Sequence, residues 1–364
     1  MGEYKILPLV LPNPDNDKID IHSIQCLCHE KLSLNPPEDR CIAWLSLLGL
    51  YPSNPNDWLS ERQRIANCYS SFIKDFKMED WEKNYIPSSC NTFDVPNPDL
   101  MCSIHIDVIR TSRHYIYFAK KPVPQGADPK DRFACYNEHI RRLERILYIF
   151  GSINCSFSYM QGFNELVFPF YFQFNEAFDL FYGNGDLIEA VSFQCLQQIV
   201  TNSEISNFYS SSDLAGNISI EMEIFDELLS YHAPKYAEKL RALNVKSILF
   251  AYKWFNLLFT QETSLPNILR IWDVLFSYQP KMEDFLFYIG VAHFILIMDN
   301  IDNQELRFSD VITYLQNAKI MNPDELIKIA ETLYRKDIRR RNLYLPPFLR
   351  KPSLIEQITR NIIF

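Results

Sequence analysis

An aspartate and an arginine stand three residues apart in the apolar stretch IHIDVIRTSR, which runs from Ile104 to Arg113. Side chains at i and i+3 are neighbours on a helix, so Arg110 could simply pair with Asp107. An exposed pair of this kind contributes only about 0.3 to 0.5 kcal/mol. The guanidinium of Arg110 could instead bind a phosphate, because its planar fork of N–H donors matches phosphate oxygens. These residues alone leave both interpretations open.

A glutamine with two possible roles lies in SYMQGFNELVFPFYF, from Ser158 to Phe172. Ser158 precedes Gln161 by three residues, just ahead of an apolar run, which is the pattern of a capping box. In that interpretation the Gln161 amide only satisfies a backbone N–H at the start of a helix. The pattern by itself favours this structural role.

A third polar group lies in SLPNILRIWDVLF, from Ser264 to Phe276. Its spacing predicts an amphipathic helix in which Arg270 pairs with Asp273 at i and i+3. The inward-facing residues of this helix would be Ile268, Leu269, Trp272 and Phe276. By itself, this pattern also indicates a structural role.

Several classes of site are disfavoured by the sequence. The chain has no G-x-x-x-x-G-K-[ST] motif, and GNG at Gly183–Gly185 lacks the third glycine of a dinucleotide site, so we expect no nucleotide site. The cluster His22, Cys26, Cys28 and His29 imitates a zinc site but has no second pair at a suitable spacing. We therefore expect buried or idle thiols there and no metal. The net charge of −9, from 36 basic and 45 acidic residues, argues against a nucleic-acid partner.

The elements that must position these side chains are predicted to be helices. In CYNEHIRRLERILYIF the apolar residues recur at helical spacing, with the charged residues on the other face. The same pattern is present at 61–76, 221–240 and 324–338, whereas hairpin signals are missing. The apolar run Phe285–Met298 has 14 residues, which is short for a membrane span, and predicts a buried helix. We predict an all-α protein in two packed halves that meet near Tyr182 to Asp186.

The order of the three stretches resembles the TBC domain of Rab GTPase-activating proteins. That family carries I-x-x-D-x-x-R, matched by Ile104, Asp107 and Arg110; Y-x-Q, matched by Tyr159 and Gln161; and R-x-W-D, matched by Arg270, Trp272 and Asp273. Upstream, RCIAWLSLLGLYP resembles the opening helix of the family through Arg40, Trp44, Leu48 and Gly49. The resemblance implies a TBC domain at 36–345 with halves of about 36–185 and 186–345, an N-terminal extension at 1–35 and a C-terminal tail at 346–364.

The resemblance also implies a function and a division of roles. The protein would activate GTP hydrolysis by a Rab GTPase, with Arg110 supplying a cation and Gln161 a water-orienting amide in trans. It would not be an enzyme with its own nucleotide, and the GTP and Mg²⁺ would belong to the partner. Asp107, Tyr159 and Asn164 would support these two groups. Arg270, Trp272 and Asp273 would lie beneath them, with Arg270 pairing with Asp273 or reaching the partner.

Two departures from the family pattern and two other functions remain to be weighed. Ser112 and Arg113 stand where the family commonly has a proline, and Phe163 where it has a methionine. A TBC fold can also serve as a non-catalytic Rab-binding or scaffold module. A membrane-surface adaptor would use the basic residues Arg335, Lys336, Arg339, Arg340 and Arg341, although a solvated helix end is the simpler interpretation.

The opening MGEYKILPLV supports neither a signal peptide nor myristoylation, and the nine cysteines favour a reducing compartment, so we expect a cytoplasmic protein that at most contacts endomembranes.

Overall fold

The computed structural model describes residues 3–10, 18–30, 32, 35–154, 156–210, 214–301 and 306–340. Every regular element within these ranges is a helix, so the predicted all-α class is confirmed. The α-helices are joined by short 3₁₀ helices: η1 Leu7–Leu9, η2 Pro55–Asp57, η3 Trp81–Lys83, η4 Thr111–Tyr117, η5 Ala134–Tyr136, η6 Phe178–Phe181, η7 Glu204–Phe208 and η8 Ser247–Leu249.

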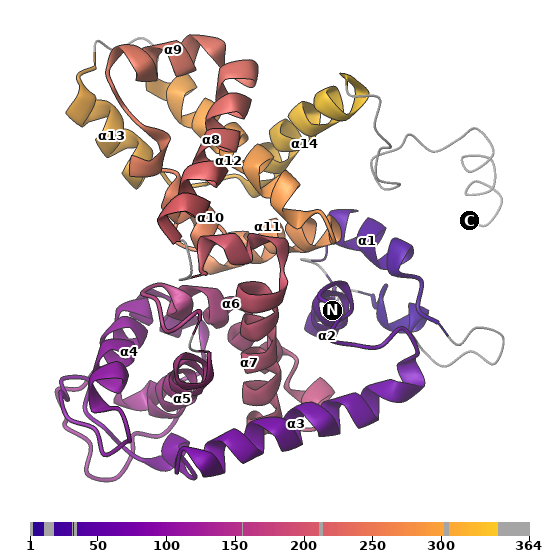
Figure 1. Cartoon of the computed structure of the whole chain (residues 1–364). Coiled ribbons are helices and arrows are strands. Elements are labelled where there is room, and N and C mark those ends of the chain that lie inside the picture. The colour runs from indigo at the N-terminus through magenta and orange to yellow at the C-terminus, as the bar shows by residue number, and fades with distance from the viewer. Residues whose placement is uncertain are drawn as a thin grey trace.

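The helices gather into two lobes, one above the other in Figure 1. The lower, N-terminal lobe contains α2 Pro37–Leu47, α3 Trp58–Asp75, α4 Pro98–Arg110, α5 Asn137–Ile153, α6 Phe163–Glu176 and α7 Gly185–Asn202. Helix α3 runs along the base of this lobe, and α7 packs against α3, α5 and α6. Arg110 and Gln161, the two residues expected to act in trans on a partner's nucleotide, therefore belong to this lobe.

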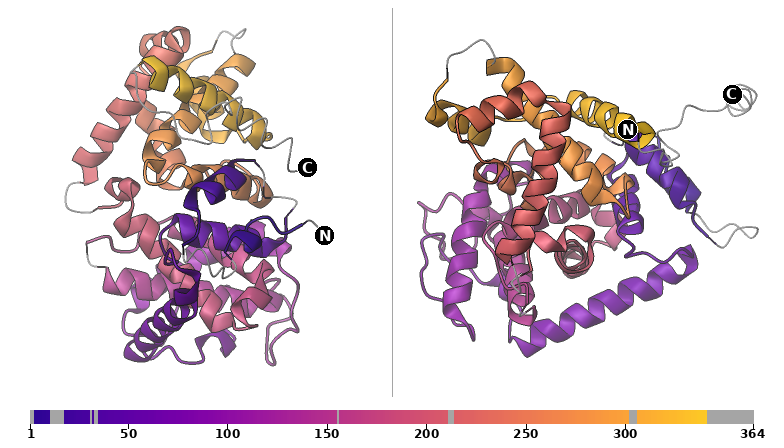
Figure 2. Two further views of the ribbon diagram at one scale, coloured as in Figure 1. Left: turned by 90° about the vertical axis from the view of Figure 1, so that its right-hand side faces the viewer. Right: turned by 45° about the horizontal axis from the view of Figure 1, so that its top comes forward.

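The upper, C-terminal lobe contains α8 Leu214–His232, α9 Pro234–Ala242, α10 Tyr252–Asn256, α12 Met282–Ile301, α13 Phe308–Asn317 and α14 Pro323–Arg340. Helix α11, Leu265–Ser277, lies between the lobes and contacts α2 and α6 on one side and α12 and α14 on the other. Helix α1, Ile21–Glu30, packs on α2 and α11, so part of the expected N-terminal extension covers this junction. The side view in Figure 2 shows the lobes as stacked layers.

The predicted seam between the halves lies at the start of α7. Because α7 packs on α3, α5 and α6, it belongs by its contacts with the helices that precede this point. The division of the chain at 185–186 stays a prediction, and the predicted C-terminal tail, 346–364, lies outside the described residues.

The predicted helix at 221–240 is wrong in its continuity. The chain forms α8 and α9 there, with a break at Ala233, because Pro234 opens the second helix and cannot continue the first. The helices predicted at 61–76, 264–276 and 324–338 correspond to α3, α11 and α14.

A cluster of large aromatic side chains joins the lobes. Trp44 on α2 contacts Phe170 on α6, with ring centroids 5.6 Å apart, and Trp272 on α11, at 5.8 Å. Phe276, one turn after Trp272, stacks on Phe170 at 5.9 Å. All four rings are buried, so α2, α6 and α11 are held together by this cluster.

Helix α12 confirms the buried helix predicted from the apolar run. By length and composition it could cross a membrane, but 72% of its most apolar 18-residue window is buried inside the protein. Its side chains form the core of the C-terminal lobe.

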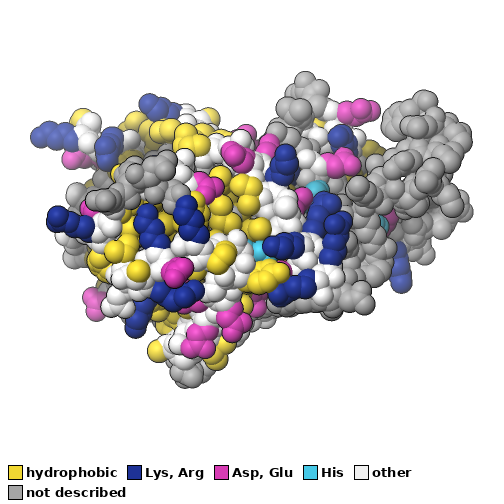
Figure 3. Space-filling view, turned by 90° about the horizontal axis from the view of Figure 1, so that it is seen from above, with side chains coloured by type: hydrophobic (Ala, Val, Ile, Leu, Met, Phe, Trp, Pro, Cys, Tyr) yellow, Lys and Arg dark blue, Asp and Glu magenta, His cyan; other side chains and the backbone are white. Residues whose placement is uncertain are grey.

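The basic cluster near the C-terminus ends α14. Arg340 lies over the ring of Tyr231 at 4.1 Å and 3.9 Å from Asp337, and Arg335 lies 3.7 Å from Glu331. In the view from above, Lys and Arg side chains lie on both sides of this face, with Asp and Glu side chains among them (Figure 3). Arg341 lies outside the described residues. These contacts fit a helix end packed on its neighbours, and lipid contact by this cluster stays untested.

Candidate functional site

Arg110 is the last residue of α4, and its side chain faces solvent. The helix begins after Asn97, whose side chain accepts a hydrogen bond from the Leu100 amide and so caps the N-terminus. The Arg110 side chain is 67% exposed, and its Nη1 lies 3.4 Å from Oδ1 of Asp107. The predicted i, i+3 pair is therefore present. At that distance and exposure it is weak, and the guanidinium keeps N–H donors available for another group.

Gln161 lies in the loop before α6 and not in a capping box. Helix α6 begins at Phe163 with Gly162 as its N-cap residue, and no side chain caps it. The capping interpretation is wrong because Ser158, with φ of +34°, lies five residues before the helix begins at Phe163. The Gln161 side chain is exposed and makes no hydrogen bond to any of the described residues.

Gly162 is required directly after Gln161. Its φ is +111°, in the region that favours glycine, and a Cβ there would lie 2.6 Å from Cδ2 of Leu257. Leu257 follows α10 in the C-terminal lobe. The loop with Gln161 is therefore pressed closely against the opposite lobe.

The segments that carry Arg110 and Gln161 are connected through Asp107. The hydroxyl of Tyr159, two residues before Gln161, donates to Oδ2 of Asp107 at 2.9 Å. The Nδ2 group of Asn164 donates to the backbone oxygen of Asp107 at 3.0 Å and to Oγ1 of Thr111 at 2.6 Å. Asn164 thus binds the end of α4, and the described structure gives it no hydrogen bond to the Gln161 amide.

Asp107 is a buried carboxylate at the centre of these bonds. Burial raises its pKa above the usual value, although hydrogen bonds from Tyr159 and the charge of Arg110 oppose the shift. Burial beside Asp107 likewise raises the pKa of Tyr159. The Tyr159 hydroxyl therefore keeps its proton and acts as a donor to Asp107.

Arg270, Trp272 and Asp273 lie on α11, but the predicted Arg270–Asp273 pair is wrong. Arg270 donates from Nε to Asp324 at 2.9 Å and from Nη1 to the backbone oxygen of Cys28 at 3.0 Å. Burial places it inside the fold, away from a partner.

Asp273 faces the opening helix of the domain. It accepts hydrogen bonds from Nε of Arg40 at 2.9 Å and from Nε1 of Trp44 at 3.0 Å. The indole of Trp272 donates to the backbone oxygen of Leu258 at 3.0 Å. Two of the motifs therefore meet each other and hold α2 on α11.

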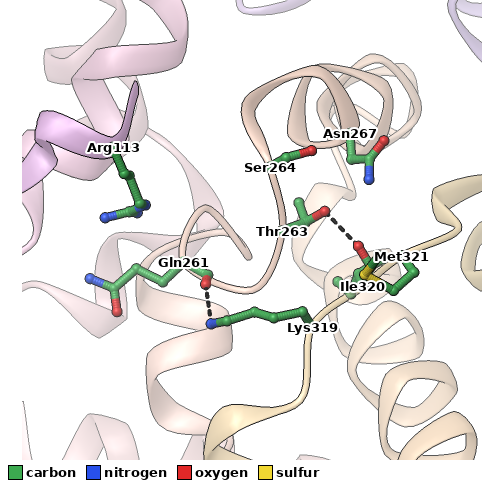
Figure 4. Close-up of a pocket in the computed structure, with 8 residues that line it drawn as sticks. All are labelled: Arg113, Gln261, Thr263, Ser264, Asn267, Lys319, Ile320 and Met321. Atoms are coloured by element: carbon green, nitrogen blue, oxygen red, sulfur yellow. Dashed lines mark hydrogen bonds between the residues drawn. The ribbon is translucent and has the colours of Figure 1, made fainter. Parts of the chain in front are cut away.

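A pocket of about 570 Å³ opens between the lobes beside this site. Arg113, on η4, lines it from the N-terminal lobe, and the other walls come from Gln261, Thr263, Ser264, Asn267, Lys319, Ile320 and Met321. Figure 4 shows hydrogen bonds from Lys319 to the Gln261 backbone oxygen and from Thr263 to the Ile320 backbone oxygen. These bonds shape the wall that faces Arg113.

Arg113 and its partner Glu165 were not among the predicted site residues. Sequence analysis noted Arg113 only as a departure from the family pattern. The position of Arg113, three residues after Arg110, was the signal that could have marked it as a site residue. Its ion pair could not be read from the sequence, because Glu165 lies 52 residues away.

The four cysteine and histidine side chains on α1 do not converge on one point. The Sγ atom of Cys26 lies 3.8 Å from Nε2 of His22, Cys28 is buried, and His29 contacts Glu331 on α14. Among the residues that the structure describes, no three His, Cys, Asp or Glu side chains form a group that could hold a metal.

The fold, and the motifs placed on it, agree with a known family. The model of the Rab-GTPase-TBC domain matches residues 38–301, and the chain belongs to this family. A similar protein is TBC1 domain family member 13 of Mus musculus, which is 32% identical over 359 residues, covering 77% of this chain and 88% of the relative.

Other relatives are longer than the matched region. The human TBC1 domain family member 13 is 29% identical over 290 residues, covering 75% of this chain and 62% of the relative. The GTPase-activating protein gyp1 of Schizosaccharomyces pombe is 25% identical over 346 residues, covering 90% of this chain and 59% of the relative. The matches thus span less than two thirds of these two proteins.

A solved structure confirms the fold. The crystal structure of the Ypt/Rab-GAP domain of Gyp1p superposes with a TM-score of 0.68 at 19% identity, covering 92% of this chain and 96% of that one. At this identity the likeness concerns the fold alone.

Proposed function

We propose that this protein accelerates GTP hydrolysis by a Rab-family GTPase, with Arg110 and Gln161 acting in trans at the nucleotide of the GTP-bound partner. One observation carries the proposal. Arg110 and Gln161 are both exposed, while the Asp107, Tyr159 and Asn164 side chains beneath them join their two segments through hydrogen bonds. In a member of the Rab-GTPase-TBC family, this arrangement supports two polar groups that can reach the nucleotide of a partner.

The chemistry of the two side chains suits this reaction. Negative charge is spread over the oxygens of the transferred phosphoryl group, and the attacking water must be oriented. A guanidinium is permanently charged and forks onto phosphate oxygens, which a lysine cannot reproduce. A carboxamide can donate to phosphate and accept from water, so Gln161 suits the second task.

The partner would supply the nucleotide and the metal ion. GTP and Mg²⁺ would be bound by the Rab GTPase, and the activator would contribute side chains and no cofactor of its own. By ending the GTP-bound state of its partner, the protein would regulate vesicle trafficking. It would act from the cytoplasm, at the membranes where GTP-bound Rab proteins reside.

The test is phosphate release from a panel of GTP-loaded Rab GTPases, measured under single-turnover conditions with the full chain in excess. We expect acceleration of about 10³- to 10⁵-fold for at least one Rab. Binding to the same panel is measured separately. A Rab that binds tightly in its GTP form but hydrolyses GTP at its intrinsic rate would favour the alternative, a non-catalytic Rab-binding or scaffold module.

A further inference from the structure

We propose that Arg113 is a positioning residue: its ion pair with Glu165 braces the segment after Arg110 against the first turn of α6, which follows Gln161. The inference rests on the proposed function, since it concerns how the two exposed groups keep a fixed relation. Neither Arg113 nor Glu165 belongs to the motifs that identified the site.

The geometry of the pair is that of a two-point clamp. Nη1 of Arg113 donates to Oε1 of Glu165 at 2.9 Å, and Nη2 donates to Oε2 at 2.6 Å. A bidentate pair fixes orientation as well as distance, because both planar groups must stay aligned. Arg113 lies three residues after Arg110, and Glu165 lies four after Gln161.

The clamp differs from a surface ion pair because one partner is buried. The Glu165 side chain is 4% exposed, while that of Arg113 is 44% exposed. Burial opposes ionisation of Glu165, yet hydrogen bonds and charge from His114 and Arg113 keep its pKa below the usual value. Glu165 is therefore an anion held within the fold, and η4 supplies both Arg113 and His114, the side chains that contact it.

The surroundings make η4 and α6 a single unit at this point. His114 lies 3.8 Å from Glu165, and its ring lies over Phe168, with centroids 5.2 Å apart. Tyr115, also on η4, contacts the same Phe168 at 5.9 Å. Arg113 itself also lines the pocket between the lobes (Figure 4).

The position of Arg113 argues for bracing and against direct contact with the GTPase. Two of its terminal nitrogens are already committed to Glu165. Moving the guanidinium to a partner would take the bidentate counter-charge away from a buried carboxylate, which is costly. Among the described residues, Arg110 by contrast makes only the long 3.4 Å contact to Asp107 and can turn toward a ligand.

The kinetic test separates the maximal rate from the apparent affinity. Single-turnover GTP hydrolysis is measured against increasing concentrations of the full chain, for wild type, Arg113→Ala, Arg113→Lys and Glu165→Gln. We expect Arg113→Ala to lower the maximal rate roughly 10- to 100-fold, because misplacement of reacting groups has costs of this order. The concentration that gives half the maximal rate should stay unchanged.

The conservative and double variants sharpen the result. Arg113→Lys should restore part of the rate, since it keeps the charge but loses the fork. The double variant Arg113→Ala/Glu165→Gln should be no slower than Arg113→Ala alone, because the two substitutions remove the same ion pair. The matched control is Arg64→Ala, which removes an exposed arginine that also makes two hydrogen bonds to one carboxylate, Glu61, on α3.

Hydrogen–deuterium exchange tests the brace without any GTPase. The amides of Glu165 and Leu166 both donate to the backbone oxygen of Gly162 and report the first turn of α6. Arg113→Ala should speed their exchange at least about tenfold, while Arg64→Ala should leave it unchanged. Unchanged exchange in Arg113→Ala would overturn the proposal, as would a raised half-maximal concentration with an intact maximal rate.

The two measurements also separate this proposal from the proposed function. If wild type activates no Rab but Arg113→Ala loosens α6, the brace stands as a structural device and the activity is refuted. If wild type activates a Rab and Arg113→Ala is as fast, the activity stands and the positioning role is refuted.

Discussion

Replacing Asp107 by Asn should lower GTPase activation modestly and leave the fold intact. The substitution removes the charge that faces Arg110 at 3.4 Å but keeps an oxygen that can accept from Tyr159. Because Arg110 is 67% exposed, its pair with Asp107 is worth less than about 1 kcal/mol. Loss of that interaction free energy corresponds to a decrease of about fivefold or less in the maximal rate of GTP hydrolysis.

The stability of the Asp107→Asn variant should change little for a related reason. Burial raises the pKa of Asp107, so its ionised form costs free energy in the folded state. The neutral amide avoids that cost while the weak pair is lost. We expect the free energy of unfolding to stay within about 1 kcal/mol of wild type.

The assay is single-turnover hydrolysis by a responsive Rab together with a denaturant unfolding curve. Glu61→Gln is the matched control, because Glu61 faces Arg64 at the same i, i+3 spacing on α3. A loss of more than 100-fold in a folded Asp107→Asn variant would refute the reasoning, since Asp107 would then act on the partner. An unchanged rate would mean that the GTPase alone orients Arg110.

Three further changes test the surroundings of the site. Gly162→Ala should cost about 1 to 3 kcal/mol of stability, from the positive φ and the contact with Leu257, and should slow activation; unaltered unfolding and rate would contradict this. Asp273→Asn should cost about 3 to 5 kcal/mol in chemical denaturation, because Arg40 loses its buried counter-charge, and a loss below 1 kcal/mol would argue against this pairing. Burial lowers the pKa of His293 to about 3, so the neutral ring contributes to the free energy of unfolding above pH 6.5, and this contribution is lost as the pH falls toward 3. The loss is roughly 3 kcal/mol by pH 4.5, and His293→Phe should flatten this part of the pH profile of unfolding.

Helix periodicity was a reliable guide to the elements but not to their environment. The spacing of apolar residues predicted the helix at α5, and the structure places it at Asn137–Ile153. The charged face of that helix is nevertheless buried, because Arg142 and Arg145 pair with Glu189 on α7. A pattern within one helix cannot reveal counter-ions that another helix delivers.

Local spacing also misassigned the partners of the α11 motif. An i, i+3 rule predicted that Arg270 pairs with Asp273, whereas Asp273 pairs with Arg40, 233 residues away. Tertiary packing overrides the local option because a buried carboxylate gains more from several donors on another helix than from one neighbour on its own helix.

The candidate site was found by a different route. Local patterns left Arg110 between an ion pair and a phosphate contact and favoured a structural role for Gln161. The order of three short motifs then indicated a family, and that family is confirmed. Their catalytic roles stay a prediction. Arg113 and Glu165 were missed because neither forms a motif and their contact depends on the docking of η4 on α6.

The most direct test of the proposed mechanism is single-turnover GTP hydrolysis by a responsive Rab with Arg110→Lys, alongside a melting curve. Arg64→Lys is the matched control, since Arg64 is 62% exposed and has an i, i+3 carboxylate partner. If Arg110 contacts the transferred phosphoryl group, Arg110→Lys should lower the rate of GTP hydrolysis by about 10³- to 10⁵-fold at an unchanged melting temperature, with Rab binding retained. A near-normal rate for a folded Arg110→Lys variant would contradict the account and return Arg110 to the role of a surface partner for Asp107.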